Sequence, residues 1–196
     1  MHHLQQVFAD DNVAVLYVYC DYKDQANQTD RNLFANLAKQ SILQQADLPA
    51  EAKVLCDSCA GGESSPSSMQ CLDLLVSSMA SFRRTFIILD AVDEHLPSGN
   101  DEYNPDIPLL RELSSIQQKI SGRCTIFITS REILSIQEQL QDRIRLDIRA
   151  HEEDIKSYVN SRIYDDKKFT FAKEIRTDSA LANEIVEKMV AKAQGM

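Results

Sequence analysis

The fold is decided by the stretch RTFIILDAVDE, which spans residues 84–94. It begins as an apolar run, reaches Asp90, and adds Asp93 and Glu94 three and four residues further on. A short apolar run without alternation is typical of a strand that is buried on both faces, as strands of parallel sheets are. The stretch therefore predicts an interior strand that delivers three carboxylates to one rim of a sheet.

Other strands are predicted on either side of this one. VAVLYVY at residues 13–19 and TIFIT at residues 125–129 are also continuous apolar runs, and the second is followed by Ser130 and Arg131. RIRLDI at residues 143–148 alternates apolar and charged residues instead. Alternation with period two predicts an edge strand that has one face in water.

Between the strands, apolar residues recur at helical spacing, and Gly, Ser and Pro gather in two stretches that predict loops. Strands that alternate with helices need crossover connections. We therefore expect an α/β fold in which helices flank a mostly parallel sheet like that of P-loop NTPases. The predicted helices span residues 30–45, 69–82, 108–120, 133–140, 151–163 and 178–193, and the predicted loops span residues 57–68 and 96–107.

Composition excludes several classes of function. Hydrophobic residues make up 43% of the chain, which is enough for a core, and the formal net charge is −9. Because nucleic-acid binding needs concentrated positive charge, no nucleic-acid partner is expected. No apolar run approaches the ~18 residues of a membrane span. The N-terminus lacks the pattern of a signal peptide and the five cysteines are an odd number, which predicts reduced thiols in the cytoplasm.

Cys56 and Cys59 have the spacing of half a zinc site, but no second pair follows, so we interpret them as incidental.

The candidate chemistry lies where the predicted strands end. In open parallel sheets, ligands bind off the carboxyl ends of the strands. Asp90 with Asp93 and Glu94 could take a hydrated Mg²⁺, which uses one or two carboxylates and keeps most of its waters. Arg131, at the end of a neighbouring strand, could bind a terminal phosphate through its fork of donors.

These residues resemble a known family. Residues 84–94 are similar to the extended Walker B motif of NACHT-type signalling NTPases, which belong to the STAND class of P-loop NTPases, and most of all to the nephrocystin-like subgroup of fungal NLR-like receptor proteins. IFITSR at residues 126–131 resembles the sensor 1 strand of that family. Residues 15–25 and 146–155 resemble the segments after its first helix and after sensor 1.

The resemblance implies roles for individual residues. Asp90 would hold Mg²⁺ through water, Asp93 or Glu94 would position the hydrolytic water, and a bound ATP would be contacted at the next strand tip. The parent protein would be a slow ATPase that acts as an innate-immunity-like signalling switch in the cytoplasm. Its partners would be the nucleotide, further copies of itself, and flanking effector and repeat domains. The nucleotide-contacting residues would be Thr129, Ser130 and Arg131.

The sequence departs from the family at one motif. A P-loop reads G-x-x-x-x-G-K-[ST], and none of the five glycines here precedes a lysine. Without the loop's backbone donors and its lysine, ATP loses its main phosphate contacts. We therefore expect a fragment without the P-loop strand, with residues 1–163 as a partial NTPase core and 164–196 as the start of a helical region. ATPase activity of this chain alone is not expected, and the strand near residues 145–148 should be the least securely placed.

Two alternatives stay open at this point. The chain could be a non-catalytic interaction or oligomerisation scaffold derived from an NTPase, which the missing P-loop favours. It could also be a receiver-like phosphoacceptor domain, with Asp90 as acceptor and Thr129 on the next strand. The receiver pattern also needs a lysine at the last strand, where this sequence has Arg145 and Arg149.

Overall fold

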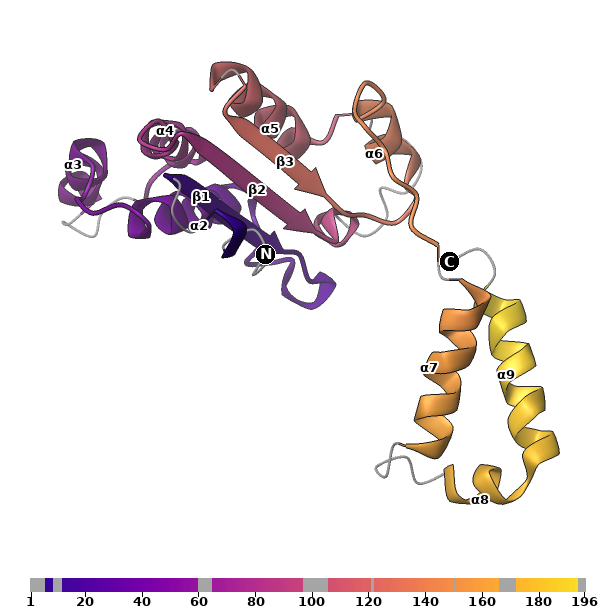
Figure 1. Ribbon diagram of the computed structural model, residues 1–196. Helices are drawn as coiled ribbons and strands as arrows, with labels where there is room; N and C mark the ends of the chain where they lie inside the picture. The colour runs from indigo at the N-terminus through magenta and orange to yellow at the C-terminus, as the bar shows by residue number, and fades with distance from the viewer. Residues whose placement is uncertain are drawn as a thin grey trace. The chain divides into compact units, whose positions relative to one another are not determined.

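The computed structural model describes residues 6–8, 12–59, 65–96, 106–120, 122–149, 151–165 and 172–193. The chain divides into two compact units, Met1–Asp142 and Arg143–Met196 (Figure 1). This division reflects packing alone, and the assignment of residues 1–163 to one NTPase core stays a prediction. No helix in the described ranges has the length and apolar character that crossing a lipid bilayer requires.

The first unit is built on a three-stranded parallel sheet, which confirms the predicted α/β fold. Its strands are β1 (Val13–Tyr19), β2 (Arg84–Asp90) and β3 (Cys124–Ile128), in the order β1-β2-β3. The central strand carries the decisive stretch, as its continuous apolar run predicts. Leu16 of β1 pairs with Ile87, and Ile87 with Ile126, so the three strands end side by side at one edge of the sheet.

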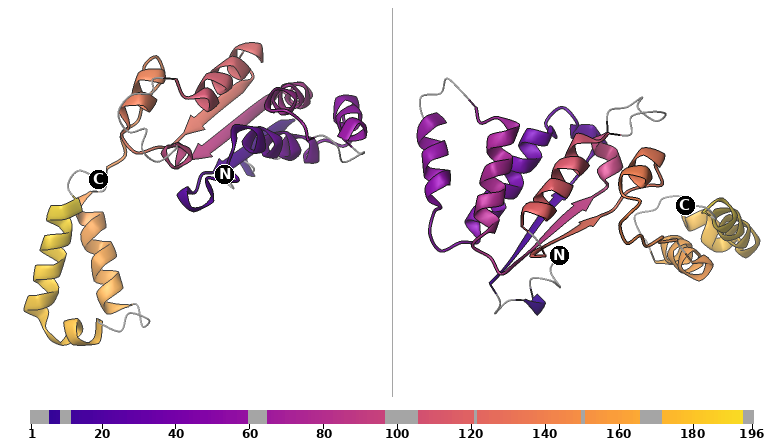
Figure 2. Two further views of the ribbon diagram at one scale, coloured as in Figure 1. Left: turned by 180° about the vertical axis from the view of Figure 1, so that it is seen from behind. Right: turned by 90° about the horizontal axis from the view of Figure 1, so that it is seen from above.

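Helices of the first unit cover one face of the sheet (Figure 2). Parallel crossovers are right-handed, so a chain that keeps stepping in one direction across a sheet places its helices on the same side. The connection from β1 to β2 holds α2 (Asp30–Leu43), α3 (Ala50–Cys59) and α4 (Ser68–Met79), and α5 (Pro108–Lys119) joins β2 to β3, after which α6 (Leu134–Gln139) follows. The fully buried side chains at the centre of this layer include Leu16, Phe34, Leu37, Leu75, Met79, Ile87, Leu89, Leu110, Leu113 and Ile116.

The outer edge of β1 is closed by two glutamines, Gln40 of α2 and Gln44, which caps the C-terminus of that helix. Gln44 accepts a hydrogen bond from Val15 N at 3.1 Å and donates one to Val15 O at 3.2 Å. Gln40 does the same one strand repeat away, accepting from Tyr17 N at 2.9 Å and donating to Tyr17 O at 2.7 Å. Each side-chain amide thus takes the place of a peptide group of a neighbouring strand, so this edge exposes no free pairing groups at residues 15 and 17.

The second unit is a helical hairpin. Its elements are α7 (Glu152–Tyr164), α8 (Ala172–Thr177) and α9 (Ser179–Ala193). A small apolar core joins the two long helices, with Val159 and Ile163 on α7 against Val186 and Val190 on α9. Glu152, Glu153 and Asp154 occupy the first turn of α7, where the helix dipole favours acids.

Two features of the structure differ from the prediction. The predicted edge strand at residues 143–148 is wrong, because this segment forms no strand in the described part of the chain. Its apolar residues Ile144, Leu146 and Ile148 are 82–103% exposed, so alternation alone did not secure a place in the sheet. The predicted loop at residues 57–68 is also partly wrong, since α3 continues to Cys59 and α4 starts at Ser68. Residues 60–64 of that loop, and 97–105 of the other, lie outside the described residues.

Candidate functional site

The carboxyl ends of the three strands form the candidate site. Cys20, just after β1, donates its backbone N–H to Asp90 O at 3.0 Å. On the other side of β2, Thr129 donates its backbone N–H to Leu89 O at 2.9 Å. These bonds extend the sheet ladder by one residue at both neighbours, so the polar residues that follow each strand lie at one rim.

Thr129 connects the end of β3 to the end of β2. Its hydroxyl donates to Asp90 Oδ1 and accepts from Ala91 N at 2.9 Å, and its carbonyl accepts from Val92 N at 3.0 Å. Ala91 has a φ of 55° and a ψ of 48°, in the left-handed region, and the short helix η2 (Val92–His95) follows it. This turn folds the chain after β2 back against β3, which sets the direction of the next two acids.

Asp93 is buried and bound to Arg131. Its side chain is 3% exposed, and its carboxylate accepts from Arg131 N at 3.1 Å and from Arg131 Nε at 2.6 Å. The arginine side chain is 77% exposed, so the guanidinium lies at the surface while the acid lies beneath it. A buried carboxylate without such partners would be costly, so Arg131 compensates Asp93 in this conformation.

Glu94 is held from the β1 side. Its Oε2 accepts from Tyr22 N at 3.0 Å, at the start of the short helix η1 (Tyr22–Asp24). Gln25 donates from Nε2 to Glu94 O at 2.9 Å and to Leu96 O at 3.0 Å. The loop after β1 thus fixes the backbone that carries the acids.

The structure therefore brings together most of the residues that the sequence singled out. Asp90 contacts Thr129, and Asp93 contacts Arg131, while Ser130 points its hydroxyl to the carbonyl of Arg131 at 2.9 Å. Their roles in binding or hydrolysis stay predictions.

Sequence reasoning missed the residues that support the rim from the β1 side. Tyr22 and Gln25 lie in a segment that matched the family, yet their backbone and amide contacts follow no recognisable spacing. His95 was also missed, and its Nε2 lies 2.8 Å from Asp30 Oδ1, which ties the end of η2 to the first turn of α2.

The rim carries a concentrated negative charge. Burial, together with the carboxylates of Asp93, Glu94 and Asp90, raises the pKa of the Cys20 thiol to about 11, because both disfavour a negative charge on the sulfur. The same carboxylates would attract a cation to this rim.

The donors at the rim suit a hydrated hard cation. Within the described ranges no group of three or more His, Cys, Asp or Glu side chains is arranged to hold a metal. Asp90 and Thr129 nevertheless supply oxygen donors at the end of the central strand. Mg²⁺ often uses only one or two carboxylates and keeps its waters, so this donor set fits Mg²⁺ bound through water and does not fit a closed metal cage.

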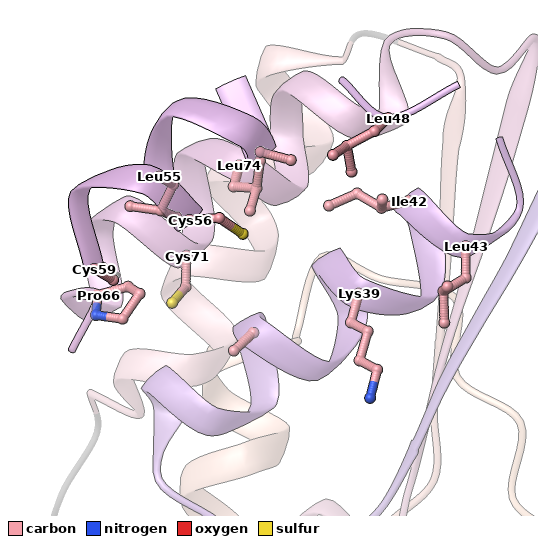
Figure 3. A pocket seen from close by; sticks show the side chains of 12 residues that line it. Lys39, Ile42, Leu43, Leu48, Leu55, Cys56, Cys59, Pro66, Cys71 and Leu74 are labelled. Carbon is pink, nitrogen blue, oxygen red and sulfur yellow. The ribbon is translucent and has the colours of Figure 1, made fainter. Parts of the chain in front are cut away.

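A separate apolar pocket lies away from the strand tips, between α2, α3 and α4 (Figure 3). It has a volume of about 340 Å³ and contains none of the predicted site residues. Cys71 lines it together with Cys56 and Cys59, so the fold brings the two cysteines of the predicted half-site near a third. Its other lining residues are Ala35, Lys39, Ile42, Leu43, Leu48, Ala52, Leu55, Pro66 and Leu74.

Ala91, whose backbone is in the left-handed region, gives a prediction that tests the geometry of the rim. Ala91→Gly should raise the free energy of unfolding by about 0.5–1 kcal/mol, because glycine has no Cβ to strain at positive φ. Ala80→Gly is the matched control, since Ala80 has a φ of −64° and a helical conformation. That variant should lose about as much stability as the first one gains. Urea denaturation followed by circular dichroism measures both changes, and a destabilised Ala91→Gly protein would contradict the turn described here.

The comparisons with known proteins agree with the extent of this unit. A family model described as Nephrocystin 3, N-terminal matches residues 1–131. The match covers all three strands and ends at Arg131, so it includes every residue of the candidate site. No curated protein and no solved structure matches the chain significantly.

Proposed function

Because the chain belongs to the nephrocystin 3 N-terminal family, we propose that its strand tips form the Mg²⁺-facing and γ-phosphate-facing half of an ATP-binding, NACHT-type switch. The observation that carries the proposal is the pairing of an exposed Arg131 with an acid of the neighbouring strand tip, next to the Asp90–Thr129 contact. A guanidinium at the surface can exchange its carboxylate partner for a phosphate, since both offer oxygens to the same fork of donors.

In this proposal the three acids have different roles. Asp90 would hold Mg²⁺ through water, and the ion when bound would neutralise charge on the phosphates. Asp93 would keep Arg131 in place until a phosphate competes for the guanidinium. Glu94 would orient the attacking water, because Oε2 is bonded to Tyr22 N while Oε1 accepts no hydrogen bond within the described part of the chain.

The same proposal limits what this chain does alone. Its sequence contains no G-x-x-x-x-G-K-[ST] motif, so the 196 residues lack the usual contacts to the β- and γ-phosphates. We expect no measurable ATP turnover by the isolated chain. Hydrolysis, and control of self-association by ATP, would belong to a cytoplasmic signalling protein that supplies those contacts together with effector and repeat domains.

Manganese tests the cation half of the proposal, because Mn²⁺ replaces Mg²⁺ and broadens nearby NMR signals. Titration into the ¹⁵N-labelled chain should broaden the amide signals of Ala91, Val92 and Thr129 first. Asp90→Asn should remove most of this effect, while Asp73→Asn, at an exposed acid on α4, should leave it unchanged. Equal broadening in both variants, or none at millimolar Mn²⁺, would contradict a cation site at Asp90.

ATP tests the phosphate half in samples that contain diamagnetic Mg²⁺ instead of Mn²⁺. Adding ATP to the Mg²⁺-loaded chain should shift the amide signals around Arg131. Arg131→Ala should abolish that shift, while a separate Mn²⁺ titration of the variant should still show the broadening. If ATP acts equally on both proteins, Arg131 does not contact the phosphates.

A non-catalytic scaffold is the second candidate. The observation that favours it is the ion pair between Asp93 and Arg131, whose hydrogen bonds stabilise the rim without any ligand. A scaffold predicts that neither Mn²⁺ nor ATP perturbs the rim, and that Arg131→Ala lowers the free energy of unfolding by about 1–2 kcal/mol through the lost charge-assisted bond. The receiver-like alternative gains no support from these contacts.

A further inference from the structure

Three of the cysteines line one apolar pocket of the first unit. Cys56 and Cys59 lie one turn apart on α3, on the same face as Ala52, and Cys71 lies on α4 across the pocket. All three are free thiols, and the pocket contains no residue of the strand tips. The fold thus gathers three nucleophilic sulfurs at a place that the proposed nucleotide switch does not use.

The wall of this pocket offers a ligand very few polar partners. Among the described residues that line it, every side chain except Lys39 and the three cysteines is a hydrocarbon. Lys39 is exposed, so its ammonium can stay in water while its aliphatic stem covers part of the wall. The volume of about 340 Å³ lies at the lower end of the ~300–1,000 Å³ range of small-molecule sites. A ligand that fits is therefore small and apolar, and sulfur is the reactive group that it meets there.

Helix α3 leaves apolar surface for such a ligand to cover. Ala52 is the one residue that this helix buries. Leu48, just before the helix, is 60% exposed, and Leu55 is only half-buried. An apolar ligand in the pocket would remove these side chains from water, which favours its binding.

The three thiols differ in how easily a ligand can reach and react with them. Cys71 is 4% exposed, and burial raises the pKa of its thiol, which disfavours the reactive thiolate. Cys59 is half-buried, whereas Cys56 is exposed. In Figure 3 the Cys56 sulfur points toward the side of the pocket that Ile42 and Leu48 form. Cys56 therefore combines contact with water, where a thiol can ionise, with a position on the pocket wall.

We propose that this pocket is a covalent binding site for apolar α,β-unsaturated carbonyl compounds, with Cys56 as the nucleophile. The Cys56 thiol loses its proton to water, and the thiolate adds to the β-carbon of the bound compound. A carbon–sulfur bond forms and the carbon–carbon double bond becomes single. Its electron pair moves through the α-carbon to the carbonyl as an enolate, which takes a proton from water. The addition has no leaving group and needs no oxidant.

This class of ligand suits the pocket for two reasons. Conjugate addition exchanges its protons with water, and in the part of the wall that the structure describes Lys39 is the one acid–base side chain besides the thiols. The carbonyl group can also stay in water beside exposed Cys56 while the hydrocarbon tail lies against Leu48 and Leu55. Because the strand tips take no part, the inference does not depend on nucleotide binding.

Two vinyl ketones that differ only in the length of the tail test the proposal. The freshly reduced full chain would be treated with pentyl vinyl ketone or methyl vinyl ketone, with glutathione as the reference thiol, and the adducts followed by peptide mass spectrometry. After division by the glutathione rates, Cys56 should favour the pentyl compound at least about tenfold, because burial of about two of its four extra methylene groups supplies that factor. Cys59 and Cys71 should receive less of it than Cys56.

A charge on the pocket wall should remove this preference. Leu48→Asp places a carboxylate where the tail would lie, so Cys56 should lose its preference for the pentyl compound. Val54→Asp is the matched control, because Val54 is 69% exposed on α3 and is not among the lining residues, and it should keep the preference. Both substituted side chains are exposed, so circular dichroism should show a folded protein in each case. The ratio of the two ketone rates cancels any change in the ionisation of Cys56.

Three results would overturn the proposal. The first is a wild-type chain that reacts with both ketones as glutathione does. The second is a preference for the pentyl compound that Leu48→Asp leaves intact. The third is a pentyl adduct that forms mainly on Cys59 or Cys71.

Discussion

Phe34→Ala is expected to lower the free energy of unfolding of the sheet unit by about 3–5 kcal/mol, the cost of emptying a well-packed aromatic site. Phe34 lies on α2, is 1% exposed, and belongs to the core between the helices and the sheet. Because small domains are stable by only about 5–15 kcal/mol, this loss is a large share of the total. Urea denaturation followed by circular dichroism near 10 °C measures it.

The control for this variant is Phe127→Ala on β3. The ring of Phe127 is 48% exposed, so its removal should cost about 1 kcal/mol or less in the monomer. Both variants delete the same atoms, so the difference between them reports burial. Equal losses would mean that α2 does not pack on the sheet as described.

Cysteine reactivity should differ about a hundredfold within the same chain. Burial raises the pKa of Cys124 from 9.0 to about 11, and burial and the rim carboxylates raise that of Cys20 to about 11. At pH 8 a two-unit increase lowers the thiolate fraction from about a tenth to about a thousandth, and only the thiolate reacts. Exposed Cys56 should be alkylated by iodoacetamide at least a hundred times faster than either, as peptide mass spectrometry would show.

The same shifts predict how stability depends on pH. In the unfolded chain the thiols of Cys20 and Cys124 lose their protons near pH 9, whereas in the folded chain they keep them until about pH 11. Their contribution to stability is therefore complete below pH 9 and is lost as the pH rises from 9 to 11. Cys20→Ser and Cys124→Ser variants should reduce this alkaline loss.

Comparable alkylation of buried and exposed thiols in the native protein would contradict the burial described here.

The strands could be predicted from the sequence because their signal is local. Continuous apolar runs led to strands at residues 13–19 and 125–129, and the structure has Val13–Tyr19 and Cys124–Ile128. Such runs are typical of the strands of parallel sheets. The alternating residues 143–148 carry a weaker signal, because an amphipathic strand forms only where a neighbouring strand offers hydrogen bonds.

Helix α3 was not predicted, because its sequence carries no clear local signal. Residues 50–59 bury only Ala52, so their apolar residues form no clear stripe, and the nearby Gly, Ser and Pro residues favoured a loop. Its helical state follows from tertiary context, which a periodicity argument does not see.

The candidate site was predictable in its members but not in its contacts. Strand-tip acids and Arg131 could be recognised from spacing and from the family motif. The pairing of Asp93 with Arg131 depends on the left-handed turn at Ala91. The local sequence does not predict that turn, because the position holds alanine and not glycine. The support of Glu94 by Tyr22 depends on the alignment of two strands that are far apart in sequence.

Gln40 of α2 and Gln44 at its C-cap also fix the position of this helix along β1. Gln40 and Gln44 are four residues apart, which is about 6 Å along a helix, and they bind Tyr17 and Val15, which are two residues or about 6.6 Å apart along a strand. The two repeats nearly coincide, so helix and strand are held in one register. Inserting a residue between the glutamines would turn one of them about 100° away from the strand, so this part of α2 should tolerate substitutions far better than changes in length.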